Sequence, residues 1–427
     1  MEIHVVQRGE NLYSIARQYG VPISQIQNDN QLPDPSRLVA GQTLVIRFPL
    51  QVHTVQAGQT LRSIAQQYGS SIRQLQRNNP ILGGGTTIYP GQILVISYSQ
   101  QPEGTLSVNG YAYPFIDPVL LQSTLPFLSC LTPFTYGITE EGSLVDLNDN
   151  ELISAATHSG VAPLMHLSTL TEEGGFSNEL AGLVLNNSDI QNQLINNIVA
   201  TIQQKGYRGL DVDFEFIFAR DAGPYAAFIR NLTQELNPLG IPVIVALAPK
   251  TSATQPGLLY EGHDYAALGA AANQVLLMTY EWGYAYSMPM AVAPLPNVRA
   301  VIEYALSEIP AEKIWLGIPN YGYDWPMPYI QGQTKATSIS NRYAVQLALR
   351  YNAEIQFDDR AQTPWFQYTD EQGNAHEVWF EDARSVRAKL ALIPEYGLYG
   401  AGYWNLMRPF PQNWVLLSSM YNIRDGI

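Results

Sequence analysis

Hydrophobic positions in the first hundred residues follow a block that occurs twice. The segment HVVQRGENLYSIARQYGVPISQIQNDN (4–30) aligns with HTVQAGQTLRSIAQQYGSSIRQLQRNN (53–79) at an offset of 49 residues. The block ends, AGQTLVI (40–46) and PGQILVI (90–96), align at an offset of 50. Each block has the pattern of a strand, a glycine turn, two helices and a closing strand. The repeat therefore predicts two small βααβ domains in tandem.

A different pattern begins after the linker 97–104 (SYSQQPEG), where short apolar runs alternate with helical stretches such as 188–206 and 223–240. Eight of the runs have strand character: 111–115, 131–138, 161–168, 208–216, 241–249, 273–282, 313–323 and 398–407. Strands that alternate with helical crossovers are typical of a parallel α/β sheet. We therefore predict the α/β class, with a (β/α)8 TIM barrel after the two βααβ domains. The predicted domain boundaries are 1–49, 50–98 and 99–427.

The run GLDVDFEF (209–216) carries the strongest chemical signal. As a strand, it places its apolar and acidic residues on opposite faces: Leu210, Val212, Phe214 and Phe216 against Asp211, Asp213 and Glu215. Neighbouring carboxylates on that face are about 7 Å apart by strand geometry, close enough to raise one another's pKa. An antiparallel strand with a solvated face would explain the pattern without function. In a barrel, however, the acidic face points inward, where three carboxylates indicate catalysis.

Composition narrows the possible partners. The 427 residues have a net charge of −14, 46% hydrophobic residues and one cysteine, Cys130, so no intramolecular disulfide can form. Residues 1–99 hold seven arginines, no lysine and four acids, a charge of +3, which leaves −17 on the rest. We expect no nucleic-acid partner for so acidic a body. No apolar run reaches membrane-spanning length, and the start MEIHVVQRGE lacks the features of a signal peptide, so we expect neither a membrane span nor secretion by that route.

The tandem blocks resemble the LysM module in their V-x-x-G-x-x-L-x-x-I-A opening, their central Asn and their late G-Q-x-L-x-I. The resemblance implies binding of N-acetylglucosamine in peptidoglycan or chitin. It places the glycan on loops marked by these residues: Gly9, Leu12, Asn30, Gly58, Leu61 and Asn79. Many of the motif positions build the fold instead, so only exposed loop positions would touch sugar. Two tethered copies would bind a repetitive polymer with avidity.

The body resembles glycoside hydrolase family 18. GLDVDFE matches the D-x-D-x-E signature, and three further motifs follow in order: LLMTYEW (276–282), GIPNYGYDW (317–325) and GAGYWNLM (400–407). The segment 381–392 resembles the helix before the last strand. Four ordered motifs are more specific than any one of them. The family is a substrate-assisted exception among glycosidases, in which the sugar's own acetamido oxygen attacks C1.

The resemblance implies roles for individual residues. Glu215 would be the general acid, Asp213 would bind the acetamido N–H, and Asp211 would share a proton with Asp213. Tyr280 would hold the acetamido oxygen by a hydrogen bond, and Trp404 would form the floor under the sugar. The other expected contacts are Glu281, Trp282 and Tyr321, with Tyr284 and Tyr323 as further wall residues, although each of these aromatic residues has a packing role as an alternative.

Two positions depart from the family pattern, and one segment is short. Arg208 occupies the position of the Asp that begins the fuller motif, and Glu281 replaces the Asp that often follows M-x-Y. We expect Arg208 to alter packing or coupling rather than abolish activity, and Glu281 to change the acetamido environment. The segment 326–380 indicates a reduced insertion and an open groove.

With its two LysM-like blocks, the whole chain resembles the spore cortex-lytic N-acetylglucosaminidases of spore-forming bacteria. The domain order and MTYEWGY…PMAVAP (278–294) carry this resemblance. It implies retaining hydrolysis of β-1,4 bonds after N-acetylglucosamine in cortex peptidoglycan strands or fragments during germination. It also implies a protein made in the mother cell without a signal peptide and deposited at the coat–cortex boundary of the spore.

Three alternatives remain open at this level. A chitinase or chitooligosaccharide hydrolase would differ in substrate, a peptidoglycan-binding lectin would lack catalysis, and a coat protein would use the barrel only as structure. Glu215, Asp213 and Tyr280 are all present, which argues against the two non-catalytic hypotheses, the lectin and the coat protein. We expect a monomer that needs no cofactor and no metal, because the six histidines show no metal-ligand spacing.

Overall fold

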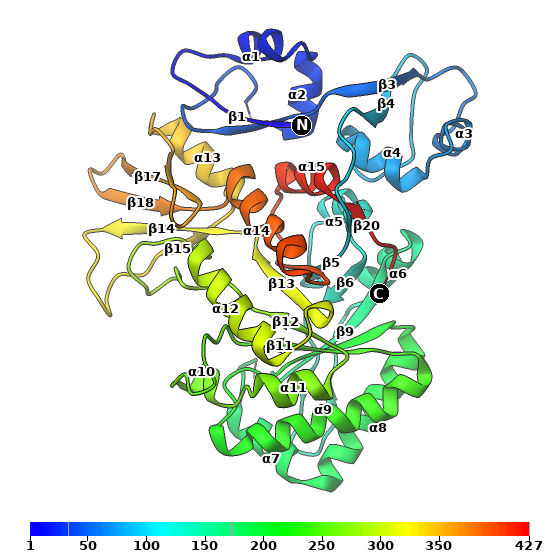
Figure 1. The fold of residues 1–427 in the computed structure, drawn as a ribbon, viewed down its shortest axis with the longest axis vertical. Helices are drawn as coiled ribbons and strands as arrows, with labels where there is room; N and C mark the ends of the chain where they lie inside the picture. Colours follow the sequence, from blue (N-terminus) through cyan, green and yellow to red (C-terminus); the bar gives the residue numbers. More distant parts are fainter. Residues whose placement is uncertain (33, 172–173, 427) are drawn as a thin grey trace.

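Two small modules lie beside one large body in the computed structural model of the chain, which describes residues 1–32, 34–171 and 174–426. In Figure 1 the first module (blue) lies above the body, the second module (light blue) lies to the right of the first, and an inserted sheet (yellow to orange) extends to the left of the body. The body contains the barrel, and the two modules contact the helices on the outside of this barrel.

Each module has the predicted βααβ order. Module 1 contains β1 (Glu2–Val5), α1 (Leu12–Tyr19), α2 (Ile23–Asn30) and β2 (Thr43–Ile46). Module 2 contains β3 (Pro49–Thr54), α3 (Leu61–Gln67), α4 (Ile72–Asn78), a 3₁₀ helix (Pro80–Leu82) and β4 (Ile93–Tyr98). The two strands of each module pair antiparallel. β3 begins at Pro49, one residue before the predicted start of the second module, and β4 ends at Tyr98, the last residue predicted for that module.

Local sequence explains why the first helix of each module begins where it does. Asn11 and Thr60 precede these helices, and each side chain accepts a hydrogen bond from the backbone N–H of the serine three residues later. The serine side chains accept in return from the backbone of Asn11 and Thr60, which completes a capping box. The buried faces of the helices then supply the small module cores, for example Ile15.

Eight parallel strands close the barrel. They are β5 (Thr105–Ala112), β6 (Cys130–Pro133), β9 (Ala162–Ser168), β10 (Gly209–Asp213), β11 (Val243–Leu247), β12 (Gln274–Leu277), β13 (Ile314–Pro319) and β19 (Gly400–Trp404). Each pairs with the next in this order, and β19 pairs with β5 to complete the circle. A short strand, β20 (Asn422–Ile423), adds to β5 near the end of the chain.

Helices surround the barrel, as Figure 1 shows. They are α5 (Pro118–Thr124), α6 (Asn150–His158), α7 (Asn178–Asn186), α8 (Ser188–Lys205), α9 (Ala222–Leu236), α10 (Leu258–Glu261), α11 (Tyr265–Ala271), α12 (Leu295–Glu308), α14 (Ala383–Tyr396) and α15 (Pro411–Met420). Four 3₁₀ helices (Leu125–Phe127, Ala219–Asp221, Asn237–Leu239 and Ala311–Lys313) and a hairpin of β7 (Gly137–Ile138) with β8 (Leu144–Val145) complete the body. The predicted fold class is confirmed.

Two strand predictions need correction in detail. The first barrel strand begins at Thr105, six residues before the predicted run 111–115, and ends at Ala112. The fourth strand ends at Asp213, and Phe216 has a φ of +55°, so the backbone turns there. Phe216 is consequently exposed instead of joining Leu210 and Val212 in the core.

An inserted subdomain lies between β13 and α14. It contains a five-stranded antiparallel sheet of β14 (Gly322–Met327), β15 (Thr337–Ile339), β16 (Gln356–Asp358), β17 (Thr363–Thr369) and β18 (Ala375–Trp379). One helix, α13 (Asn341–Arg350), packs into a core with this sheet. β14 begins four residues before the predicted segment 326–380, so the predicted bounds leave out the start of this sheet; the reduced size of the insertion stays a prediction.

The modules dock on the body through specific contacts. The Gln412 side chain of α15 donates to the Thr43 backbone oxygen at 2.7 Å and to the Asn30 side chain at 3.0 Å. In module 2, Arg77 Nε donates to the Pro126 oxygen at 2.6 Å. Both modules are thus held by the helical outside of the barrel.

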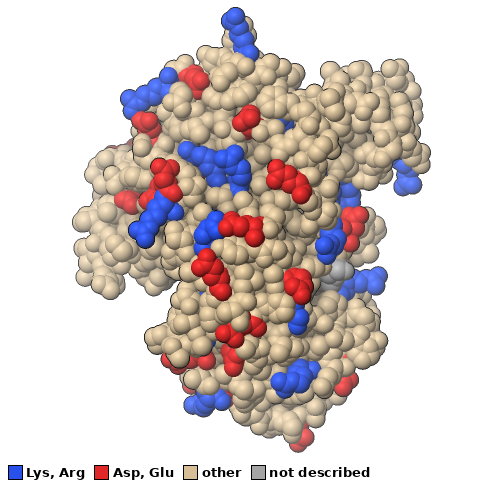
Figure 2. Space-filling view, viewed as in Figure 1, with Lys and Arg blue, Asp and Glu red and all other residues tan. Residues whose placement is uncertain are grey.

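Charge is mixed on the face that Figure 2 shows, where Lys and Arg side chains lie among Asp and Glu side chains. No helix in the described part of the chain has the length and hydrophobicity to cross a membrane.

Candidate active site

The acidic residues of the fourth barrel strand lie in one row at its carboxyl end. Asp211 and Asp213 belong to β10 and are 0% and 7% exposed, and Glu215 follows two residues after the strand. Within the parallel sheet, Asp211 lies opposite His166 and Asp213 lies opposite Ser168 of β9. The carboxyl ends of barrel strands are where TIM-barrel active sites form.

Asp211 lies deepest in the row and accepts a hydrogen bond from the Tyr111 hydroxyl at 2.5 Å. Burial raises the pKa of the Asp211 carboxyl to about 7, although the bond from Tyr111 acts in the opposite direction. The other oxygen of Asp211 is buried without a hydrogen-bond partner in the described residues. A carboxyl in this state holds a proton over much of the acidic range.

Asp213 lies between the other two carboxyls. Burial raises its pKa well above the ordinary value, and the negative charges of Glu215 and Asp211 raise it further. Its Oδ2 lies 3.7 Å from His166 Nε2, while its Oδ1 is buried and meets no hydrogen-bond partner among the residues described. Since a buried unpaired carboxyl oxygen is costly, Asp213 is suited to receive an N–H from a ligand.

His166 supports this arrangement as a neutral group. Burial lowers the pKa of its imidazole to about 3, and its Nδ1 lies 2.6 Å from the Thr135 hydroxyl. It therefore adds no positive charge that would hold Asp213 ionised. The sequence prediction did not include His166, although its place on β9, level with Asp211, follows from strand register.

Glu215 is half-buried at the cleft that the carboxyl row faces. Burial raises the pKa of Glu215, and the charge of Glu281 adds to the effect. A carboxyl with a raised pKa retains its proton at a pH where an exposed Glu has lost it, as a general acid requires.

Tyr280 and Glu281 follow β12 and reach the same cleft. Burial and the surrounding carboxylates raise the pKa of Tyr280 well above its ordinary value, so its hydroxyl remains a donor. Gly317 on β13 makes room for the ring, because a Cβ there would lie 2.9 Å from Tyr280 Cε1. Glu281 accepts hydrogen bonds from the hydroxyls of Tyr321 and Tyr323.

Tyr321 does not line the cleft as predicted. It is 6% exposed and acts through Glu281, whose carboxylate it holds by its hydrogen bond. The structure thus places Tyr321 behind Glu281, and its predicted contact with substrate stays a prediction. The expected effect of Glu281 on the acetamido environment stays a prediction, but the carboxylate is fixed in place by two phenols.

Arg208 lies outside the cleft. It is exposed at the start of β10, where its backbone N–H donates to the Pro163 oxygen at 2.8 Å. The side chain that departs from the family pattern thus lies at the opposite end of the strand from Asp213.

The cleft has a volume of about 270 Å³ and aromatic walls. Its lining includes Asp213, Glu215, Tyr280, Glu281, Trp282 and Trp404, all predicted, together with Tyr113, Phe134, Phe176 and Tyr260, which the sequence prediction missed. The Trp404 ring, at the end of β19, packs edge-on against Phe134 with 4.9 Å between ring centroids. Aromatic faces with convergent carboxyls are suited to a sugar ring that carries polar groups.

The module residues predicted to bind glycan fall into two groups. Gly9 and Gly58 are exposed in their loops, with φ near +87° and +84°, a conformation that favours glycine. Leu12 and Leu61 are buried in the module cores.

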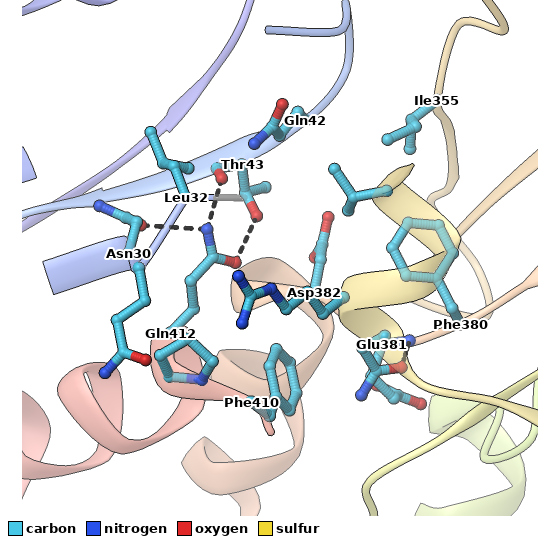
Figure 3. Close-up of a pocket in the computed structure, with 15 residues that line it drawn as sticks. Asn30, Leu32, Gln42, Thr43, Ile355, Phe380, Glu381, Asp382, Phe410 and Gln412 are labelled. Carbon is cyan, nitrogen blue, oxygen red and sulfur yellow. Dashed lines mark hydrogen bonds between the residues drawn. The ribbon is translucent and has the colours of Figure 1, made fainter. Parts of the chain in front are cut away.

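Asn30 and Asn79 are also buried, and they require a correction. Each side chain donates to a strand carbonyl, Val45 and Val95 respectively, and accepts from the same residue's N–H. Figure 3 shows Asn30 facing Gln412 of the body. Because these amides tie the second helix to the closing strand, their side chains are not free for sugar.

Family models match both parts of the chain. The model described as "Glycosyl hydrolases family 18" matches residues 155–408, and the LysM domain model matches residues 4–47 and 53–97.

Several known proteins are similar to the chain. The "Cortical fragment-lytic enzyme" of Bacillus subtilis (strain 168) is 44% identical, over 99% of both chains. The crystal structure of the Bacillus megaterium QM B1551 spore cortex-lytic enzyme SleL is 39% identical with a TM-score of 0.84, over 100% of this chain and 99% of that one. A chitinase structure from Chromobacterium violaceum is 28% identical with a TM-score of 0.68, over 74% of this chain and 98% of that one.

Proposed function

The chain belongs to glycoside hydrolase family 18, and from this premise we propose that it hydrolyses β-1,4 bonds after N-acetylglucosamine in spore cortex peptidoglycan. It is a glycoside hydrolase, and similar proteins over its full length are described as enzymes that lyse cortex or cortical fragments. The observation that carries the proposal is the carboxyl of Asp213, which lines the same cleft as Glu215 and Tyr280 and whose buried Oδ1 has no hydrogen-bond partner among the described residues.

In the first step the acetamido carbonyl oxygen of the bound sugar forms a bond to C1, and the bond from C1 to the leaving oxygen breaks. Glu215 gives its proton to that oxygen. Asp213 accepts the acetamido N–H with its free oxygen, and Tyr280 donates its hydroxyl to the acetamido oxygen. These contacts orient the internal nucleophile, so the protein needs no nucleophile of its own.

In the second step water attacks C1 and returns the acetamido group, while Glu215 takes the proton from the water. Both bonds to C1 form on the face opposite the group that leaves, so two inversions give net retention. Asp211, with its raised pKa, holds a proton that Asp213 can share while Asp213 changes between its partners.

The two modules would hold the polymer through their exposed loops at Gly9 and Gly58. We further propose that the protein lies at the coat–cortex boundary of the spore after synthesis in the mother cell, and that it acts as a monomer. Support comes from the cortex-related descriptions of its full-length relatives. Immunogold labelling of spore sections tests the location, and light scattering of the purified chain tests the monomer.

Digestion of purified cortex peptidoglycan and of chitin oligomers tests the reaction, with products identified by mass and reducing end. The wild type should release N-acetylglucosamine reducing ends from cortex. Glu215→Gln should slow this about 10²- to 10⁴-fold, the usual contribution of general acid–base catalysis. Glu151→Gln, an exposed carboxylate on α6, is the matched control and should behave as wild type.

Other outcomes would reassign the protein. Cleavage of chitin oligomers alone would favour the chitinase. Binding of cortex without cleavage by the wild type would contradict the mechanism and leave a lectin or a structural coat protein.

A further inference from the structure

A polar groove of about 550 Å³ lies between module 1 and the inserted subdomain. Residues 7–10 and 36–40 of the module form one wall, and Leu349 and residues 352–354 of the body form the other. We propose that this composite groove binds a peptide-bearing amino-sugar strand, so that the catalytic body completes the glycan site of module 1. The inference rests on the proposed function and adds a body wall and a ligand chemistry to it.

The two walls are fixed relative to each other beside the groove. The Ile355 N–H donates to the Ala40 oxygen at 2.9 Å, and a Cβ on Gly41 would lie 1.9 Å from the Ile355 oxygen. Asn352 holds the body wall in a tight turn with a φ of +51°. When the walls of a groove are already fixed, binding of a ligand loses less conformational entropy than it would if the walls had to become ordered.

One ion pair joins the walls at the groove. Arg8 of the module and Glu354 of the body both line it, and Arg8 Nη2 bonds to Glu354 Oε2. Their side chains are 81% and 43% exposed, and pairs this exposed add little to stability. Both groups remain accessible to a ligand, so the pair is better explained as part of a binding surface.

The charges indicate what the groove would bind. Arg37 also lines it, is exposed and has no ion-pair partner within the described chain. Glu10 is already engaged, because it accepts from the Gln7 N–H at 2.7 Å. The Arg37 guanidinium lies near enough to Asp34 for its charge to help lower the pKa of that carboxyl, but it forms no ion pair among the described residues. An exposed guanidinium beside polar loop atoms is suited to a carboxylate, which peptide stems supply and chitin lacks.

Module 2 lacks this arrangement and serves as an internal comparison. The positions equivalent to Arg8 and Arg37 are Ala57 and Thr87. At Gly91, equivalent to Gly41, a Cβ would meet no described atom within 4 Å. The body therefore completes the groove of one module and not of its repeat.

The test measures binding of the full chain, in a Glu215→Gln background that prevents cleavage, to insoluble peptide-bearing peptidoglycan and to chitin. Arg8→Ala and Glu354→Ala should each weaken binding to peptidoglycan about fivefold and leave chitin binding unchanged. The double variant should bind peptidoglycan as tightly as the single variant with the lower affinity, because the effects of two residues that act together do not add. Glu371→Ala, which breaks the similarly exposed Arg350–Glu371 pair of the same subdomain, is the control and should have no effect.

An effect of Arg8→Ala without an effect of Glu354→Ala would overturn the composite site, since the module alone would then bind. No effect of either variant would overturn the groove as a site. Cleavage by the chain with Glu215 intact is measured separately, so a failure of the proposed function is distinguished from a failure of this inference.

Discussion

At the scale of single residues, the proposed role of Glu215 as general acid would make the pH range of the reaction depend on the pKa of this carboxyl. Burial raises that pKa and the charge of Glu281 raises it further. Glu281→Gln removes the charge and keeps a side-chain oxygen for Tyr321. The pKa of Glu215 should fall, so the general acid loses its proton earlier as the pH rises. We expect the alkaline limb of the kcat/KM profile on a soluble substrate to move to lower pH; a limb that stays in place or moves upward would contradict the coupling.

Asp211 links stability to pH. Its folded-state pKa of about 7 exceeds the ordinary value of 3.8, so the folded protein holds a proton that the unfolded chain releases. The resulting stabilisation is complete below about pH 4 and is lost as the pH rises through about 7. Asp211→Asn removes this linkage and should flatten the decline of Tm between these pH values, measured by thermal unfolding. Equal slopes in variant and wild type would show that Asp211 ionises normally.

The residues that sequence could predict share one strand or one motif. Asp211, Asp213 and Glu215 follow the two-residue period of a strand, so their common face was visible without a structure. Tyr113 and Phe134 come from the ends of other strands, and only barrel closure brings them to Trp404. For Asn30 the motif was misleading. Its position in the motif does not reveal that both polar atoms of its side chain are hydrogen-bonded to the Val45 backbone.

At the scale of elements, Gly41 and Gly91 allow the docking of module 1 to be measured. Both have φ near +85°, so an alanine strains the backbone equally at the two repeat-equivalent positions, by about 1 kcal/mol. Only at Gly41 would the added Cβ also collide with the body, at the Ile355 oxygen. Gly41→Ala should therefore lower the free energy of unfolding more than Gly91→Ala does, in denaturant titrations of the full chain. Equal losses would indicate that module 1 is not seated as described.

The elements were predictable where their pattern is long and repeated. The eight barrel strands are apolar runs separated by helical stretches, and all eight exist. The first was placed late, because the aromatic run at 111–115 outweighed the plainer residues from Thr105 onward. The inserted sheet was missed in part because two of its strands, β15 and β16, have three residues each, too few to show a period in the sequence.

At the scale of the whole molecule, a buried ion pair of module 1 lies against module 2. Arg47 and Asp29 of module 1 are both fully enclosed, and the Arg47 guanidinium lies 4.0 Å from the Tyr98 ring centroid in module 2. Arg47→Ser alone leaves the buried Asp29 charge unpaired and should cost about 3–5 kcal/mol of unfolding free energy.

Module 2 supplies the matched rescue for this pair, since it has Asn78 and Ser97 at the positions equivalent to Asp29 and Arg47. The double variant Asp29→Asn/Arg47→Ser copies that neutral arrangement and should lose less stability than Arg47→Ser alone. Denaturant titration of the two variants and the wild type decides this. A double variant as unstable as the single one would mean that the contact with Tyr98, and not the unpaired charge, determines the cost.

The order of the domains was visible from the repeat and the motifs, but their docking was not. It depends on contacts between residues far apart in sequence, such as Gln412 with Thr43, whose side chains carry no motif. Sequence could therefore predict two modules and a barrel, but not that they pack into one body.

The docked modules have a mechanical consequence for the substrate. α15 and the inserted subdomain both bond to module 1, so its exposed loops and the cleft have a defined relative orientation in the structure. A polymer that reaches both sites at once would have to adopt the curvature that this orientation requires. A densely cross-linked network resists that deformation, whereas a short released strand bends at little cost. We expect the turnover of peptidoglycan by the enzyme to rise as cross-links are removed from the polymer. The stiffness of the polymer, rather than the length of its glycan chains, should set the rate.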